Sequence, residues 1–447
     1  MTAVPTVNAS IRPTMADVVM LFVALLQGAG VSASLLGDFL ALGAAEAVIT
    51  GLWLALYGWA ALRLLFRDGA SWLFWLLRYR LLLVLLVGGV VVSVSWSIDP
   101  MLSLRRVIHF AGTALLAFYI GYFFPIRQLL LLIASSLGLL LLASVMAALL
   151  LPDLGIQLYE GKLVWKGLFS DKNSLGFSAA TAMLLSVMLA WNATRVAQRL
   201  LFLLLSGVAA VALLGSQSAT SLVAMSVGLG VMLFLFGVAR AGLSRTAAVV
   251  LLSIAAVLAI LTLKGVDLSF LFSALGRSSD LTGRQQIWEA VEYLIAQRPW
   301  TGTGYGTIWF PTAESEWQQQ MLNLTWVAHH AHNGFFQTAS QLGLPATALA
   351  IFFLLQLQLE AIAIYLRFPR WLPSLAIVGF EVAFLIANVT EAYFMVDRSL
   401  FWMLQISLPV SLLRSVETVV EDEVTAAPVE WFGNDPMVSA ELTPPMR

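Results

Sequence analysis

Apolar segments of about twenty residues follow one another along almost the whole chain, and this repetition limits the fold to that of a membrane protein. A helix needs about twenty apolar residues to cross a hydrocarbon core of roughly 30 Å. Of the 447 residues, 60% are hydrophobic and only 11% are charged, whereas charged residues make up roughly a quarter of a soluble domain. The sequence therefore predicts an all-α polytopic membrane protein.

The apolar segments predict about twelve transmembrane helices, at residues 16–36, 43–66, 80–96, 106–124, 128–150, 174–192, 200–216, 219–238, 246–263, 344–366, 371–391 and 398–414. On this division, residues 1–263 hold nine helices, residues 264–343 form a long, partly helical loop, residues 344–414 hold three helices, and residues 415–447 form a tail. The boundary between the seventh and eighth helices depends on the short polar turn Gly215–Ser221. Merging those two helices would reverse the orientation of every later segment.

Arginines are concentrated in the turns on one side of the predicted membrane. They are Arg63, Arg67, Arg78, Arg80, Arg127, Arg195, Arg199, Arg240, Arg245, Arg367, Arg370 and Arg414. Because cytoplasmic loops carry an excess of Lys and Arg, we expect this side to face the cytoplasm. Both termini are then cytoplasmic, the long loop faces the outside, and the acidic tail is a flexible cytoplasmic extension.

Composition excludes several kinds of site. The chain has no cysteine, which excludes disulfides, thiolate metal sites and cysteine nucleophiles. Its net charge is −1 and its basic residues are spread singly among apolar segments, so no surface for nucleic acid is expected.

The long loop of residues 264–343 is polar, aromatic and rich in glycine. It contains Leu281–Arg284 (LTGR), Gly302–Gly306 (GTGYG) and His329–Asn333 (HHAHN), and three of the four histidines of the chain. Loops of this length are usually functional or disordered, and the tryptophans and tyrosines of this one argue against disorder. We expect the chemistry of the protein to take place here. The glycine motif has no strand before it, so we interpret it as a turn and not as a nucleotide-binding loop.

Basic residues on the outer side are informative because membrane insertion selects against them. They are Arg105, Arg106, Lys162, Lys166, Lys172, Lys264, Arg277, Arg284, Arg298 and Arg398. Several could converge on one anion, and a diphosphate is the anion that most needs Arg and Lys together. The alternative is that they anchor the protein at the interface, with their apolar stems in the lipid.

Two outer helix starts carry basic residues. Ser170, Asp171 and Asn173 are candidate N-caps of the sixth helix, whose free amides could bind an anion beside Lys172; the alternative is a plain capping loop. Arg284 precedes an amphipathic helix with apolar residues at positions 287, 288, 291, 294 and 295. A positive charge at a helix start is unfavourable unless an anion binds there.

The histidine motif predicts a general base. His329, His332, Asn333 and Phe336 have the spacing of one helical face, and a histidine at the membrane edge can accept a proton from a sugar hydroxyl. Three histidines within four residues also suggest a metal site. No carboxylate cluster accompanies them in the sequence, so we expect no metal.

These motifs together resemble those of the O-antigen ligase/polymerase superfamily of bacterial envelope glycosyltransferases, most like its exopolysaccharide polymerase branch. The resemblance rests on Trp96–Pro100 with Arg105 and Arg106, Gly167–Asn173, Ser218–Ser221, Thr282–Arg284 with Trp288, Gly302–Gly306, His332 with Asn333, and Leu342 with Gly343.

The resemblance implies a GT-C-like, inverting transferase that uses neither metal nor cofactor. It would polymerise undecaprenyl-diphosphate-linked repeat units at the periplasmic face of the bacterial inner membrane, in contact with membrane lipid and with a chain-length regulator or flippase as further partners. His332 and Arg284 would be catalytic. The diphosphate would be bound by five basic residues: Arg105, Lys166, Lys172, Arg284 and Arg398. The substrate would be positioned by Asn173, Asn333, Trp288 and Tyr305.

Two other functions remain open. An O-antigen ligase would use the same chemistry to transfer the glycan to lipid A core. A small-solute transporter would need ionisable residues near the bilayer midplane, where Glu381 is a candidate, with Glu46, His109 and Glu360 nearer helix ends. The many outer cations favour chemistry at the surface.

Overall fold

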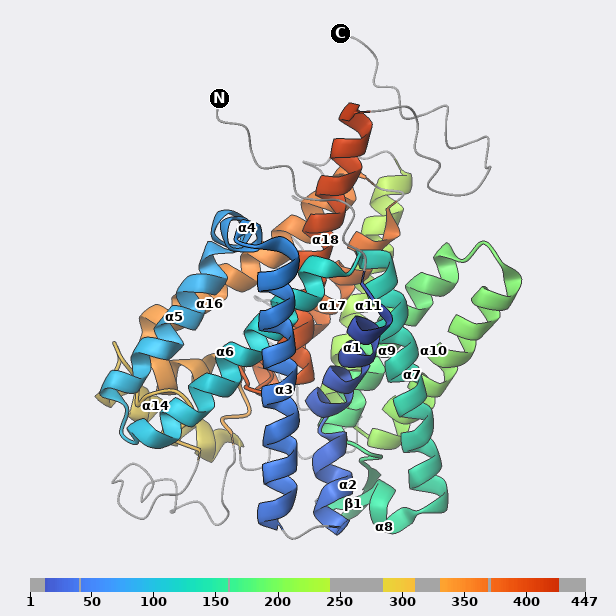
Figure 1. Ribbon diagram of the computed structural model, residues 1–447. Helices are drawn as coiled ribbons and strands as arrows, with labels where there is room; N and C mark the ends of the chain where they lie inside the picture. Colours follow the sequence, from blue (N-terminus) through green and yellow to red (C-terminus); the bar gives the residue numbers. More distant parts are fainter. Residues whose placement is uncertain are drawn as a thin grey trace.

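The computed structural model describes residues 13–39, 42–159, 161–241, 284–309, 330–368 and 371–425. Within these ranges the chain is a bundle of helices with one short β-hairpin (Figure 1). The predicted all-α polytopic fold is confirmed.

The elements up to the β-hairpin are α1 (Met15–Gly28), α2 (Val31–Phe39), α3 (Leu42–Asp68), α4 (Ser71–Tyr79), α5 (Leu81–Val92), the 3-10 turn η1 (Ser93–Trp96), α6 (Pro100–Phe123), α7 (Ile126–Leu150), α8 (Pro152–Gly155), β1 (Ile156–Tyr159) and β2 (Lys162–Trp165). The later elements are α9 (Lys172–Asn192), α10 (Val196–Ser216), α11 (Ala219–Arg240), α14 (Arg284–Gln297), α16 (Gly334–Arg367), α17 (Leu372–Thr390) and α18 (Leu400–Thr425).

The first predicted helix is divided between α1 and α2, and the ninth, at residues 246–263, lies outside the described residues. Each of the other predicted helices overlaps one described α-helix. Eight described helices are long and apolar enough to cross a membrane, or up to nine if the bent pair of α4 and α5 counts as one span. The total of twelve crossings stays a prediction. The uncertain boundary after the seventh helix is confirmed, because Gln217 adopts a left-handed conformation (φ 50°) and Ser218 caps α11.

The first predicted helix is interrupted, which the sequence analysis did not anticipate. Gly30 has φ 78°, so the chain turns between α1 and α2. A Cβ atom on Gly28 would lie 2.5 Å from Cε of Met403 and 2.9 Å from Cα of Leu400. The end of α1 therefore packs tightly against α18, and this contact between distant segments leaves no hydropathy signal.

Helix α18 extends beyond the predicted end at residue 414 to Thr425. The indole of Trp75 donates a hydrogen bond of 2.8 Å to Glu417, and Arg414 lies 3.3 Å from the same carboxylate. The first part of the predicted tail is therefore helical and is attached to α4.

Helix α16 has two parts. Gly343 (φ 81°, ψ 173°) is not helical and Pro345 follows it, so a short segment from Gly334 precedes the long apolar one. The loop Gly302–Gly306 crosses at this kink, where the amides of Thr303 and Gly304 donate to the carbonyls of Ser340 (3.0 Å) and Gln341 (2.9 Å). The prediction of a turn at the glycine motif is confirmed, and its glycines permit the close crossing.

The two ends of the bundle differ. Helix α4 and the C-terminal part of α18 lie at one end, whereas α8, the hairpin and α14 lie at the other (Figure 1). Helix α14 packs against α16 through Ile287, Val291 and Leu294, which are buried. The predicted apolar face of this helix is confirmed, and it supports the segment that carries the histidine motif.

Candidate active site

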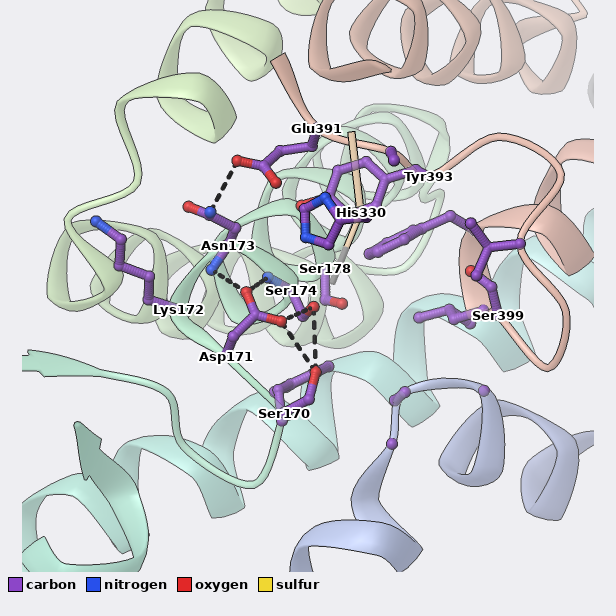
Figure 2. A pocket seen from close by; sticks show the side chains of 18 of the residues that line it. Ser170, Asp171, Lys172, Asn173, Ser174, Ser178, His330, Glu391, Tyr393 and Ser399 are labelled. Atoms are coloured by element: carbon purple, nitrogen blue, oxygen red, sulfur yellow. Dashed lines mark hydrogen bonds between the residues drawn. The ribbon is translucent and has the colours of Figure 1, made fainter. Parts of the chain in front are cut away.

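A cavity of about 360 Å³ opens among the described residues at the end of the bundle that carries the hairpin. Five segments from across the chain line it: the break between α1 and α2, strand β1, the start of α9, the residues before α16, and the connection from α17 to α18 (Figure 2). No single sequence motif could define such a cavity, because its walls meet only in the fold.

His332 lies in the cavity wall beside a carboxylate. Its Nδ1 is 3.3 Å from Oε2 of Glu391, within ion-pair distance but without hydrogen-bond geometry, and Nδ1 makes no hydrogen bond to any other described residue. The backbone N–H of His332 donates to Nδ1 of His330 at 3.2 Å, and the two rings have centroids 4.0 Å apart. The sequence predicts His332 as the general base, whereas it predicts no individual role for His330 or Glu391.

The residues before α16 are not helical, so the predicted helical face through the histidine motif is wrong. His332 has φ 50°, and Asn333 is extended (φ −162°) and caps α16 by accepting from the amides of Phe335 (2.9 Å) and Phe336 (3.1 Å). A capping residue lies outside the helix that it caps, so the chain before Asn333 takes another path. His329 lies outside the described residues.

Glu391 is the buried centre of a hydrogen-bond network. It follows α17 directly and is 3% exposed. Its Oε1 accepts from Nδ2 of Asn173 at 2.8 Å, as Figure 2 shows. Oδ1 of Asn173 accepts from Oγ of Ser218 at 2.9 Å, and Ser218 contacts Ser221 at 2.9 Å. The network thus joins the starts of α9 and α11 to the end of α17.

The start of α9 is capped from within the chain. Oδ1 of Asp171 accepts from the amides of Asn173 (2.8 Å) and Ser174 (3.0 Å), and its Oδ2 accepts from the hydroxyls of Ser170 (3.0 Å) and Ser174 (2.6 Å). The predicted use of these amides for an anion is therefore not supported, because Asp171 occupies them. The alternative of a capping loop is what the structure shows.

Lys172 and Arg398, two of the predicted diphosphate ligands, line the cavity. Lys172 is 3% exposed, and its Nζ lies 3.8 Å from the ring centroid of Tyr159, a cation–π contact with the hairpin. Arg398 has φ 57° and forms ion pairs with Glu46 (2.9 Å) and Asp397 (3.6 Å). Both cations are held in place by neighbouring groups.

Charges of both signs line the cavity. Its lining includes Lys172 and Arg398 together with the carboxylates of Asp171, Glu391 and Asp397. The expected pocket of converging cations is therefore present only in part among the described residues.

The other predicted cations lie elsewhere or outside the described part. Arg105 is exposed on α6 and Lys166 is half-buried after β2, and neither lines the cavity. Arg284 is the first residue of α14, which confirms the predicted helix start. Lys264 and Arg277 lie outside the described residues.

Trp288 and Tyr305, which were predicted to position the substrate, instead form hydrogen bonds to the protein backbone. The indole of Trp288 donates to the carbonyl of Ala331 at 3.0 Å. Tyr305 is 3% exposed and donates to the carbonyl of Met395 at 2.8 Å. Burial raises the pKa of the Tyr305 phenol well above its usual value, so it remains a neutral donor. Tyr305 thus connects the glycine loop to the segment of Arg398 and has no free face for a sugar ring.

In the fold, the carboxylate of Glu391 lies beside His330 and His332, although the sequence shows no acidic cluster near them. His330, His332 and Glu391 each offer an atom within 4.8 Å of the others, a spacing that could hold a metal ion. A ligating histidine usually donates a hydrogen bond from its other nitrogen, whereas Nδ1 of His330 accepts one from His332. The hydrogen bond that His330 accepts therefore does not favour a metal site here.

Two other acids, Glu381 and Asp397, have partners other than His332. Glu381 is buried between α17 and α18 and accepts from Gln405 at 2.5 Å. Asp397 pairs with Arg106 at 3.0 Å. Glu391 carried one signal in the sequence, since it is an acid at the end of a predicted span, on the same side as the long loop.

Comparison with known proteins agrees with these motifs. A protein-family profile described as O-Antigen ligase matches residues 200–351. The exopolysaccharide production protein ExoQ of Rhizobium meliloti (strain 1021) is 30% identical to this chain over 266 residues, which cover 57% of this chain and 58% of ExoQ. The aligned part thus spans less than two thirds of either protein. Over these residues the chain is therefore similar to the O-Antigen ligase profile and to ExoQ, in agreement with the resemblance inferred from the sequence motifs.

Proposed function

We propose that this protein is an inverting glycosyltransferase that polymerises undecaprenyl-diphosphate-linked oligosaccharide units. The observation that carries the proposal is the pairing of His332 with Glu391 at a cavity that also contains Lys172 and Arg398. A base and cations in one cavity suit the transfer of a sugar from a diphosphate to a hydroxyl. The similarity to ExoQ supports a role in envelope polysaccharide biosynthesis.

In the proposed reaction, Nε2 of His332 removes the proton of the acceptor hydroxyl. The oxygen attacks the anomeric carbon from the face opposite the diphosphate, a new carbon–oxygen bond forms, and the bond to the diphosphate breaks. The diphosphate leaves with the bonding electron pair, and the configuration inverts. Fixed cations stabilise the departing charge, so a general acid is not required.

Arg398 is the described cation best placed to exchange partners. It pairs with Glu46, whose side chain is 61% exposed. Exposed ion pairs contribute only about 0–1 kcal/mol to stability. A phosphate group can therefore replace Glu46 at little cost. Lys172 would act from the opposite wall, and we keep Arg284, Arg105 and Lys166 as further cations of the same end.

The proposed location is the bacterial inner membrane, with the cavity on the periplasmic side. The end opposite the cavity carries α4 with Arg78 and, directly after it, Arg80, in line with the positive-inside tendency. Undecaprenyl-diphosphate-linked glycan and membrane lipid would be the partners, and a chain-length regulator or flippase would act beside the polymerase.

Purified protein with one lipid-linked repeat unit tests the proposal. We expect a ladder of products, also in the presence of a chelator, and no ladder from His332→Ala or Arg284→Ala that still insert into the membrane. Normal polymer from His332→Ala would disprove the role of the base.

The same assay distinguishes the polymerase from the second candidate function, an O-antigen ligase. The matching family profile is described as O-Antigen ligase, which supports transfer to lipid A core as the alternative. A single addition to a lipid A core acceptor, without a ladder, would identify a ligase. The absence of both products would contradict a transferase.

A further inference from the structure

The two oxygens of Glu391 point to different partners. Oε1 accepts from Asn173 at 2.8 Å and Oε2 lies 3.3 Å from Nδ1 of His332. The glutamate side chain is 4% exposed and that of His332 is 19% exposed, so water competes little for the carboxylate. The contact to His332 does not have the geometry of a hydrogen bond, and catalytic hydrogen bonds are often long or poorly aligned before substrate binds and tighten in the complex.

A carboxylate only accepts hydrogen bonds, so its place beside Nδ1 favours the tautomer of neutral His332 with the proton on Nδ1. In that tautomer Nε2 keeps its lone pair. Nε2 is the atom that must accept the proton of the acceptor hydroxyl. The partner of one ring nitrogen thus sets the chemistry of the other.

The orientation of Asn173 is also determined. Its Oδ1 accepts from the hydroxyl of Ser218 at 2.9 Å, so its amide nitrogen must point to Glu391. A Cβ atom on Gly176 would lie 2.8 Å from Oγ of Ser216 and 2.9 Å from Oγ of Ser221. Helix α9 can approach the serine turn this closely because residue 176 is glycine, and this approach brings Asn173 within reach of Ser218.

His332 is also held from its backbone side. Its N–H donates to Nδ1 of His330, which accounts for the unusual positive φ. The other charged groups that line the cavity are Asp171, Lys172, Asp397 and Arg398. Glu391 is the carboxylate that approaches the ring of His332 within ion-pair distance among the described residues.

We infer that Glu391 is the positioning residue of the transferase: held by Asn173 and Ser218, it keeps the His332 ring oriented with Nε2 unprotonated toward the acceptor hydroxyl. This inference rests on the proposed function, because it requires His332 to be the base. It gives a physical role to Asn173 and to the serine turn at residues 218–221.

Glu391→Gln is the first test, because it keeps the size and the bond from Asn173 but presents an amide to Nδ1. An amide N–H beside Nδ1 would favour the tautomer with the proton on Nε2, and Nε2 could then not accept the proton of the acceptor hydroxyl. General-base catalysis contributes about 10²–10⁴-fold, and we expect a loss of that order in kcat with an unchanged KM for the lipid-linked unit. Glu292→Gln, on the exposed face of α14, is the matched control and should keep full activity.

Glu391→Asp and chemical rescue separate positioning from folding. Glu391→Asp retains a carboxylate and should recover part of the kcat lost in Glu391→Gln. Glu391→Ala should regain activity when formate is added, since formate can occupy the space of the carboxylate. Wild-type kcat in Glu391→Gln, or no response of Glu391→Ala to formate, would overturn the inference. If His332→Ala is inactive while Glu391→Gln is fully active, the proposed function survives and only the positioning role fails.

Discussion

Three non-glycine residues around the cavity have positive φ: His332 (50°), Met395 (53°) and Arg398 (57°). Such conformations are uncommon outside glycine and tend to occur at functional sites. Each is held by a specific contact. His330 accepts from the amide of His332, Tyr305 donates to the carbonyl of Met395, and Thr113 accepts from the amide of Arg398. The geometry of the cavity therefore depends in part on Tyr305 and Thr113, which do not line it.

Tyr305→Phe tests this dependence at a single atom. The substitution keeps the ring, which packs against Phe110, and removes the hydroxyl bonded to Met395. A buried carbonyl left without its donor costs about 1–3 kcal/mol. We expect a lower midpoint in thermal unfolding of the detergent-solubilised protein, whereas an unchanged midpoint would mean that the hydroxyl does not hold the segment of Arg398.

At the residue scale, the sequence predicts several residues of the cavity but not Glu391, which lies at the centre of its hydrogen-bond network. His332, Lys172, Asn173 and Arg398 line the cavity, because charged and polar residues beside a membrane span are conspicuous. Glu391 was missed, since its contact with His332 joins segments that only the packing of α16 and α17 brings together.

At the element scale, long helices were predictable and their interruptions were not. Hydropathy depends on local composition, so it located α3, α6 and α7. The break after α1 depends on packing against Met403 and Leu400. The β-hairpin escaped prediction as well, since its strands are only four residues each.

The kink of α16 gives the sharpest test at this scale. A Cβ atom on Gly343 would lie 2.4 Å from the backbone C and O of Trp300, and its backbone conformation is used almost only by glycine. Gly343→Ala should therefore destabilise the protein by about 1–3 kcal/mol or more and reduce polymer formation by displacing the segment of His332.

Gly207→Ala in α10 is the control for that substitution. A Cβ atom there would meet no atom within 4 Å, and alanine is a better helix former than glycine. Its unfolding midpoint should be unchanged or higher. Equal midpoints for the two variants would show that the crossing at Gly343 is not tight.

At the scale of the whole molecule, the direction of each helix follows from the order of the elements and from the two ends of the bundle. The hairpin and the cavity lie at the end opposite α4 (Figure 1). If the arginine-rich turns face the cytoplasm, the cavity must face the periplasm, where a lipid-linked glycan would be presented for transfer.

The absence of cysteine makes this orientation directly measurable, because one introduced thiol is the only one to react. Leu163→Cys places it on the hairpin, where residue 163 is 69% exposed, and Thr194→Cys places it in the exposed turn between α9 and α10. A membrane-impermeant maleimide added to spheroplasts should label Leu163→Cys at once and Thr194→Cys only after lysis. The reverse pattern would put the cavity in the cytoplasm and exclude polymerisation at the periplasmic face, even for a variant that remains active in detergent.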